Sequence, residues 1–239
     1  MYKIPEDFND YRRNTPYHAV KLDVIWNEFM ERKFGRQYVK YWTGKYNFGD
    51  TFSDYLIEKL YSKEKLNQMD GRRTMMFIGS EIPHWCNKDT LCCGLGWQYR
   101  PECEVHLNPD NVNPENFLYT RGKISRQRVI DSGVGISPDL PVGDSGILAS
   151  LLFKPTTKKT TDIGIITHWS GEKNHDKYIE LARKIYPDKN IQIMTMGDKS
   201  KNVEDLFNFI NSCKVVVASS LHAIIFSHSF GVPAIFFKE

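Results

Sequence analysis

The C-terminal stretch of the chain, residues 215–237, constrains the fold most, because two apolar runs flank a short polar turn and a helical pattern. Residues 215–218 are β-branched and almost continuously apolar, as in a parallel strand that is covered on both faces. Two serines end this run and can cap a helix. Apolar residues recur at helical spacing over 221–230, and a Gly-x-Pro triplet precedes a final strand at 234–237. This order predicts a strand–helix–strand unit of an α/β fold.

His222 lies at the first turn of the predicted helix, directly after the predicted strand. In open α/β sheets, ligands bind beyond the carboxyl ends of the strands. A helix N-terminus at that place offers backbone N–H groups and a partial positive charge to an anion. A lone histidine can also simply pack or cap, so a structural role stays the alternative to a ligand-binding one.

The bulk properties exclude several classes of protein. A chain of 239 residues with 41% hydrophobic residues is long enough for one large α/β domain or two small ones. Its net charge of +3 is small and spread along the chain, which gives no indication of nucleic-acid binding. The sequence has no apolar run long enough to cross a bilayer and no apolar signal-peptide core at its start. We therefore expect a cytoplasmic protein.

Five cysteines, an odd number, fit a reducing compartment better than a disulfide framework. Cys86, Cys92, Cys93 and Cys103 cluster loosely and raise the question of a zinc site. Their spacing lacks paired C-x-x-C motifs, and two of them are adjacent. Buried thiols in a strand and its loops are therefore the favoured interpretation, and no metal is expected.

A second junction between a strand and a helix lies in the first half of the chain. Residues 1–36 predict an added N-terminal helix, and the alternating residues 37–43 predict a strand that leads into N-F-G-D. Asn47, Gly49 and Asp50 form a turn there, and the helix is expected to begin near the aspartate. A glycine at this point lets the backbone approach a ligand closely. A helix cap after a glycine turn is the structural alternative.

A third junction carries fixed positive charge. A predicted strand at 117–120 is followed by Arg121, Gly122 and Lys123, and then by a predicted helix at 125–132. A guanidinium fork matches the geometry of carboxylates and phosphates, so Arg121 and Lys123 are the most plausible anion ligands of the first half. Solvated surface charge is the alternative.

Beyond residue 161 the pattern restarts as alternating strands and helices, which indicates a parallel sheet with right-handed crossovers. His168 ends the first of these strands and is expected at the same edge as His222. The predicted organisation is an N-terminal helical extension (1–36), an N-terminal Rossmann-like domain (37–153), a polar linker (154–161) and a C-terminal Rossmann-like domain (162–239). The last domain is expected to be short, since the chain stops directly after a strand. The two Rossmann-like domains are expected to face one another across a cleft.

Five motifs in order carry a family resemblance: N-F-G-D, R-G-K-I-S-R, G-D before a short helix, I-G-I-I-T-H-W and S-S-L-H-A-I-I-F-S-H-S-F-G-V-P-A. Together they span about residues 38–237, and in this order the chain resembles the polysaccharide pyruvyl transferase family, in its exopolysaccharide ketal-forming branch. The resemblance implies a GT-B-like α/β fold with parallel sheets. It also implies transfer of pyruvate from phosphoenolpyruvate onto two hydroxyls of one sugar, as a cyclic ketal.

The resemblance assigns roles to particular residues. His222 is implied as the acid/base and Arg121 as the anchor of the donor; a histidine suits acid/base work because its ordinary pKa is near neutrality. The implied donor-binding residues are Ser220, Leu221, His168 and Lys123, and the implied acceptor-side residues are Asn47, Gly49 and Asp50. Many members have an arginine where this chain has Ser220. Phosphoenolpyruvate is expected as co-substrate, without a cofactor, together with a sugar or glycan acceptor that can be membrane-associated.

Two other functions stay open. A nucleotide-sugar glycosyltransferase on the same fold predicts thermal stabilisation by UDP or GDP, although the sequence shows no acidic and aromatic pair placed to hold a ribose and base. A carbohydrate- or anion-binding relative without catalytic activity predicts binding without turnover.

Overall fold

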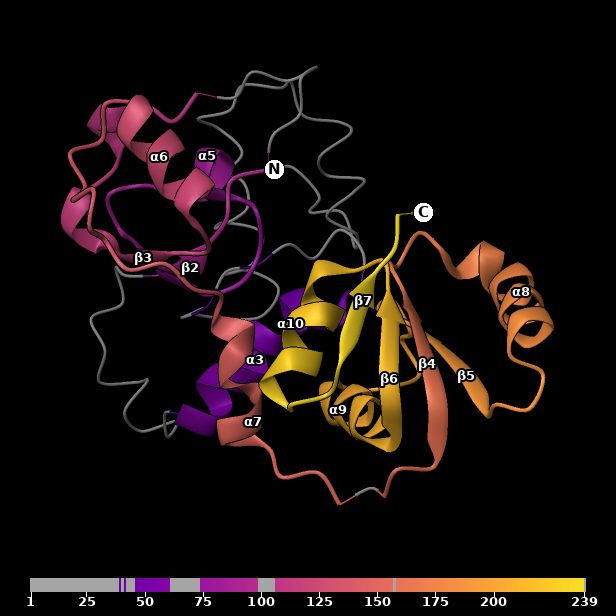
Figure 1. Cartoon of the computed structure of the whole chain (residues 1–239). Helices are drawn as coiled ribbons and strands as arrows, with labels where there is room; N and C mark the ends of the chain where they lie inside the picture. Colours follow the sequence, from indigo (N-terminus) through magenta and orange to yellow (C-terminus); the bar gives the residue numbers. More distant parts are fainter. Residues whose placement is uncertain are drawn as a thin grey trace, which may run out of the picture. The chain divides into compact units, whose positions relative to one another are not determined.

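The computed structural model of the chain consists of two compact units, which we call unit 1 and unit 2. Unit 1 comprises Met1–Gly44 and Leu60–Asp144, and unit 2 comprises Lys45–Lys59 and Ser145–Glu239. The structure describes residues 39, 41, 46–60, 74–98, 106–156 and 158–238. The predicted N-terminal helix at 1–36 lies outside these residues. Unit 2 is therefore built from two separate stretches of the chain (Figure 1).

The boundaries of these units differ from the predicted domains. The sequence pattern predicts one domain over 37–153, whereas the structure groups 45–59 and 145–153 with unit 2. The reason is aromatic packing: the Phe52 ring lies 5.9 Å from that of Phe207 and 5.2 Å from that of Phe226, both in unit 2. The predicted linker at 154–161 joins two elements of unit 2 and does not separate the units.

Unit 1 contains a three-stranded parallel sheet in the order β1-β2-β3. The strands are β1 (Thr74–Met76), β2 (Thr90–Leu95) and β3 (Phe117–Thr120). Gly94 has a φ of +87°, a conformation that suits glycine, and the register of β2 against β3 shifts on both sides of Cys93. Of the predicted strand at 37–43, the described Val39 forms a parallel bridge with Met75.

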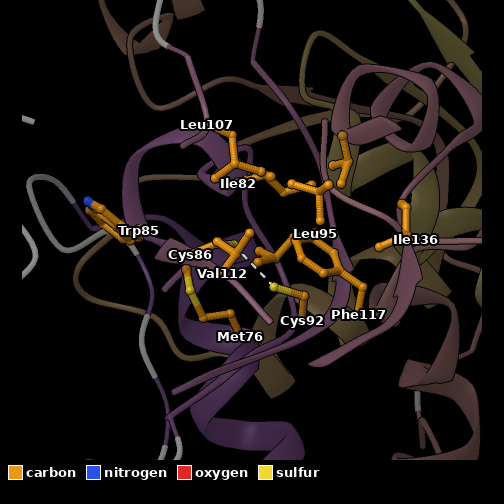
Figure 2. Close-up of a cluster of buried hydrophobic side chains, with 12 residues drawn as sticks. Met76, Ile82, Trp85, Cys86, Cys92, Leu95, Leu107, Val112, Phe117 and Ile136 are labelled. Atoms are coloured by element: carbon orange, nitrogen blue, oxygen red, sulfur yellow. Dashed lines mark hydrogen bonds between the residues drawn. The ribbon is translucent and has the colours of Figure 1, made fainter. Parts of the chain in front are cut away.

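A buried apolar cluster fills the core of unit 1 beside this sheet (Figure 2). Its members come from β1, β2 and β3, from the helices α5 (Ile82–Trp85) and α6 (Lys123–Asp131), and from the loops that flank η1 (Pro109–Asn111) and follow α6. The short helix η2 (Pro114–Asn116) lies directly before β3. The members of the cluster are Met76, Ile82, Trp85, Cys86, Cys92, Leu95, Leu107, Val112, Phe117, Val129, Val134 and Ile136. The cluster thus contains residues of all three strands and packs α5 and α6 against the sheet.

Unit 2 contains a four-stranded sheet, again entirely parallel, in the order β5-β4-β6-β7. The strands are β4 (Thr161–Thr167), β5 (Ile191–Thr195), β6 (Cys213–Ala218) and β7 (Ala234–Phe236), and the helices between them are η4 (Glu172–Asn174), α8 (His175–Ile185), α9 (Val203–Ser212) and α10 (Leu221–Ser229). The predicted α/β class with parallel sheets is therefore confirmed. The GT-B arrangement stays a prediction.

The helices of unit 2 lie on both faces of its sheet. Right-handed crossovers from β4 to β5 and back past β4 to β6 place α8 on one face and both α9 and α10 on the other (Figure 1). On the α9–α10 face, Phe207 is the centre of an aromatic cluster. Rings from α3 (Phe48–Leu60), α10 and the end of α7 (Ala149–Leu152), which follows η3 (Ser145–Leu148), surround it. This cluster makes α3 part of unit 2. No helix within the described ranges has the length and apolar composition that crossing a bilayer requires.

Candidate functional site

The topology of unit 2 makes one edge of its sheet the expected place for a ligand. From β4 the chain first adds β5 on one side and then returns to add β6 on the other side. The strand order therefore reverses between β4 and β6, and open α/β sheets bind ligands beyond the carboxyl ends of the strands at such a point. His168 follows β4 there, and Ser219 and Ser220 follow β6.

Hydrogen bonds tie the two strand ends together at this point. The backbone N–H of His168 donates to Ser219 Oγ at 2.8 Å, and the N–H of Ser219 donates to the Ile166 carbonyl at 3.1 Å. The His168 ring shares a hydrogen bond of 2.8 Å with the Ser170 hydroxyl through its Nδ1 atom. Ser219 is thus a structural part of the site, whereas the sequence indicates it only as the end of a strand and a possible helix cap. A small hydroxyl residue at the carboxyl end of a buried strand was the available signal.

The start of α10 has no side-chain cap. Ser220 occupies the N-cap position, but its side chain makes no capping hydrogen bond, whereas Asn202 and Asp205 form a complete capping box on α9. A helix start without such a cap keeps its N–H groups and its positive dipole end for a ligand anion. Ser220 is buried, and the Leu221 side chain is 47% exposed. These two donor-binding candidates therefore lie next to the anion-binding feature that the sequence predicts.

His222 is held against α3. Its side chain is only 8% exposed, and its Nε2 atom is buried. The imidazole lies directly over Gly49: a β-carbon added to this glycine would overlap the ring, at 2.7 Å from Cγ. The ring of Phe226, one turn further along α10, lies 6.2 Å from that of His222. The start of α3 and the start of α10 therefore meet at the same edge of unit 2.

The structure places Asn47, Gly49 and Asp50 in the same unit as His222, although the sequence predicts them in the other domain. Asn47 begins α3, because its Oδ1 atom accepts a hydrogen bond of 2.9 Å from the Gly49 N–H group and its carbonyl accepts one of 3.0 Å from Thr51. Asp50 is buried in the first turn. These contacts give the N-F-G-D motif a structural role, and its acceptor-side role stays a prediction.

Arg121 lies at the corresponding edge of unit 1. Its Nη2 atom donates to Ser80 Oγ at 2.7 Å and its Nη1 atom donates to the Gly79 carbonyl at 3.3 Å. The guanidinium lies on Gly96, where a β-carbon would overlap it. Loops after all three strands of the sheet therefore position the guanidinium of Arg121. Ser80 and Gly96 were missed as site residues, although small residues at strand ends are the signal for such close approaches.

The start of α6 adds to the positive charge beside Arg121. Gly122 is the N-cap and provides no side-chain cap, and the first turn holds no acidic residue. Lys123, the first residue of the helix, is exposed. A cation at a helix N-terminus is disfavoured by the helix dipole, so a bound anion would stabilise this end. Arg121, Lys123 and the uncapped helix start thus bring positive charge together in unit 1, and their role as anion ligands stays a prediction.

Two cysteines of unit 1, Cys86 and Cys92, lie within its core (Figure 2). Cys86 and Cys92 share a sulfur–sulfur hydrogen bond of 3.1 Å, and this bond together with burial raises the pKa of Cys92 well above its ordinary value. Burial raises the pKa of the Cys93 thiol to about 12. Thiols with raised pKa values stay protonated at neutral pH and are poor nucleophiles. Cys103 lies outside the described residues, among which no three potential metal ligands form a group.

A family model for polysaccharide pyruvyl transferases matches residues 86–239, which is more than half of the chain. The chain belongs to the polysaccharide pyruvyl transferase family. The part of the chain that matches the family contains Arg121, His168, Ser220 and His222, and it begins after α3. Membership confirms the resemblance that the ordered motifs indicate.

An uncharacterised protein of Acanthamoeba polyphaga mimivirus is 27% identical to the chain over 202 residues, which cover 82% of the chain. The chain spans 65% of the length of this relative. The comparison with solved structures gave no match. Family membership therefore rests on the family model and not on this relative.

Proposed function

We propose that the protein transfers the pyruvyl group of phosphoenolpyruvate onto two hydroxyls of one sugar residue, in a polysaccharide or its precursor, and forms a cyclic ketal. The observation that carries this proposal is the family match over residues 86–239. Two features of that range support it. One is the uncapped start of α10 beside His222, and the other is the cation held at the strand ends of unit 1.

The donor requires positive charge. Phosphoenolpyruvate carries a carboxylate and a phosphate on three carbons, so its site has to neutralise about three negative charges within a few ångströms. We assign this task to the start of α10 with Ser220 and Leu221, and to Arg121 with Lys123. His168, at the end of β4, is assigned to the phosphate or the acceptor. The assignment includes a GT-B-like arrangement, in which the two strand edges face one another across the substrates.

The chemistry requires a proton at carbon. The methylene carbon of phosphoenolpyruvate takes up one proton, and the adjacent carbon becomes an oxocarbenium-like centre that a sugar hydroxyl attacks. Phosphate then leaves, and a second hydroxyl of the same sugar closes the ring. The two hydroxyls lose two protons in total. One of them balances the proton delivered to the methylene carbon, and the other leaves with phosphate. We assign delivery of the first proton to His222, whose burial keeps bulk water from the ring.

A phosphate-release assay tests the proposal. The full chain is incubated with phosphoenolpyruvate and a panel of galactosyl, mannosyl and glucosyl glycosides, and any product is examined by NMR for the pyruvate methyl signal. We expect His222→Ala to lower the rate by about 100- to 10,000-fold, as for loss of a general acid. We expect Arg121→Ala to lower it by about 100- to 1,000-fold, as for loss of one stabilising group.

Matched controls separate these roles from folding. His228→Ala removes an exposed histidine from the same helix as His222, and Arg126→Ala removes an arginine of unit 1 that donates to the Leu140 carbonyl at 2.7 Å. Both are expected to keep the wild-type rate. Absence of phosphate release with every glycoside contradicts the proposal. Stabilisation by UDP or GDP would favour a glycosyltransferase, and binding of phosphoenolpyruvate without turnover would identify a non-catalytic relative.

A further inference from the structure

We infer that Gly49 is a positioning residue for His222: the absence of a side chain on α3 creates the space in which the imidazole of α10 is held. The inference assigns a function to a residue of the N-F-G-D motif that differs from the acceptor-side role predicted from the sequence. It rests on the proposed function only where it concerns turnover. Its structural part can be tested without any substrate.

The contact between the two residues leaves no room for a side chain at position 49. A β-carbon built on Gly49 would overlap Nδ1 of His222 and would lie 2.7 Å from its Cγ atom and 3.1 Å from its Cβ atom. Real β-carbons essentially never approach a heavy atom more closely than 3.0 Å. The edge of the ring that carries Nδ1 therefore rests on the backbone of α3. Any larger residue at position 49 has to displace the ring or one of the two helices.

The backbone of α3 is fixed at this point and cannot easily retreat. The Phe48 N–H group donates to the Met196 carbonyl at 2.9 Å, which ties the first residue of α3 to the end of β5. The Gly49 N–H group donates to Asn47 Oδ1 at 2.9 Å. Further along the helix, the fully buried Phe52 packs against the aromatic cluster of unit 2. The start of α3 is thus held by hydrogen bonds on one side and by packing on the other.

The backbone of α10 is held in the same way. Phe226, one turn after His222, is fully buried and contacts the rings of Phe52 and Phe207 at 5.2 and 5.3 Å. The imidazole can move by rotation about its own side-chain bonds, whereas each helix would have to break several contacts. A methyl group at position 49 is therefore expected to turn the ring away. A misplacement of about 1 Å at a reacting group can lower turnover about 100-fold.

A double-mutant cycle on the full chain tests the contact. We expect Gly49→Ala to destabilise unit 2 in the presence of His222. In the His222→Ala background the same change is expected to cost much less, because the overlap with the ring is gone, only the approach of 3.1 Å to the retained β-carbon of residue 222 remains, and alanine favours a helix. If Gly49→Ala fails to fold alone but folds in the His222→Ala background, the inference is supported. Equal destabilisation in both backgrounds, or failure to fold in both, would overturn it.

Gly164→Ala is the matched control. A β-carbon on this glycine of β4 would overlap Cys213 Sγ and lie 3.3 Å from Phe209 Cε1, so it is also a clashing glycine of unit 2. Its clash does not involve His222. The cost of this substitution is expected to be the same in the presence and absence of the His222 ring.

Imidazole NMR supplies a readout that a general loss of stability does not change. In the ¹⁵N-histidine-labelled chain, the signals of His222 are identified by their loss in His222→Gln. We expect Gly49→Ala to shift the His222 nitrogen signals, while those of the exposed His228 stay in place and Gly164→Ala leaves the His222 signals unchanged. Unchanged His222 signals in folded Gly49→Ala protein would refute the inference.

Turnover measurements connect the contact to the reaction. With phosphoenolpyruvate, Gly49→Ala is expected to lower kcat about 100-fold with a smaller change in KM, because the ring is misplaced while the donor site at α10 stays. Gly164→Ala should lower the rate only in proportion to the folded fraction. If the wild type releases no phosphate, the proposed function fails, and the double-mutant cycle and NMR still decide the role of Gly49. A kcat for Gly49→Ala equal to that of the wild type would also overturn the inference.

Discussion

Phe207 of α9 is the residue on which the packing of unit 2 depends most, and replacing it by alanine tests that packing. The side chain has 0% exposure. Its ring lies 5.1–5.9 Å from five others, which belong to Phe52, Tyr55, Phe153, Phe226 and Phe230. These neighbours come from α3, the segment after α7, and α10 with its C-terminal end. One substitution therefore removes the common partner of three segments.

The expected cost follows from burial and from ring contacts. Replacing a buried Phe by Ala costs about 3–5 kcal/mol, because the transfer free energy is lost and a cavity remains. Each aromatic pair adds about 0.5–1.5 kcal/mol beyond the contribution of buried area. The cost for a ring with five partners should therefore lie near the upper end of the range for a buried Phe. A loss of about 5 kcal/mol is comparable to the whole stability of many domains, about 5–15 kcal/mol. Phe207→Ala is thus expected to bring unit 2 close to unfolding.

Hydrogen exchange measured by mass spectrometry reports each unit separately, which matters because two units need not unfold together. We expect Phe207→Ala to lower the exchange free energy of β4 and β6 by about 3–5 kcal/mol and to leave β1–β3 nearly unchanged. Phe236→Ala is the control: its side chain is 61% exposed, so its cost should be below about 1 kcal/mol. A loss below about 1 kcal/mol for Phe207→Ala, or equal losses in both units, would refute the reasoning.

Three further predictions concern caps, thiols and the guanidinium fork. Asn202→Ala removes the capping box of α9 and should lower the free energy of unfolding by about 1 kcal/mol in denaturant titrations, whereas Ser220→Ala removes no cap bond and should cost less. Because burial raises the pKa of Cys93 from 9.0 to about 12, the unfolded chain loses this proton first. Stability should therefore fall as the pH rises from 9 towards 12, and less steeply in Cys93→Ala, in unfolding experiments at several pH values. Arg121→Lys keeps the charge but lacks the planar fork whose two nitrogens donate to the Gly79 carbonyl and the Ser80 hydroxyl, so phosphate release should fall roughly 10- to 100-fold. These predictions would be contradicted by an unchanged free energy of unfolding in Asn202→Ala, by an unchanged pH dependence of stability in Cys93→Ala, and by a wild-type rate of phosphate release in Arg121→Lys, respectively.

The sequence predicts the elements of unit 2 well, because its strands are buried on both faces and end at small polar residues. The predicted strand at 162–168 corresponds to β4 (Thr161–Thr167), and the predicted helix at 221–230 corresponds to α10 (Leu221–Ser229). Continuous β-branched runs give a strong strand signal, and glycine with proline ends a helix clearly. Local chemistry decides these boundaries, so local patterns are sufficient to find them.

The partner of α3 could not be predicted in this way. The spacing of Phe52 and Leu56 shows which face of this helix is apolar, but it carries no information about which core receives that face. The nearest strands in the sequence belong to unit 1, and the aromatic partners come from residues near the end of the chain. Long-range packing decides which unit receives the apolar face of α3, and periodicity does not encode this packing. The contact of Gly49 with His222 depends on it and was therefore missed.

The site shows the same division between local and long-range information. Arg121 and His222 can be found as candidates from the sequence because each lies between the end of a strand and the first turn of a helix, a position that local patterns reveal. Their supports cannot be found so directly. Ser80 and Gly96 hold the guanidinium from two other loops, and the sequence shows them only as small residues at strand ends.

The division of unit 2 into two stretches of the chain also determines the order in which its parts leave the ribosome during synthesis. The segment that becomes α3 emerges before all of the described strands of unit 1, whereas its partners Phe207 and Phe226 emerge near the end of the chain. At roughly 5–20 residues per second, about 8–30 s pass between synthesis of Phe52 and of Phe207. During this time the nascent chain carries apolar residues that have no native partner, while the strands of unit 1 are already complete. Among the described elements, the segment 48–60 is therefore the one with the longest wait for its native partners, and a chaperone at the ribosome exit would have reason to bind it.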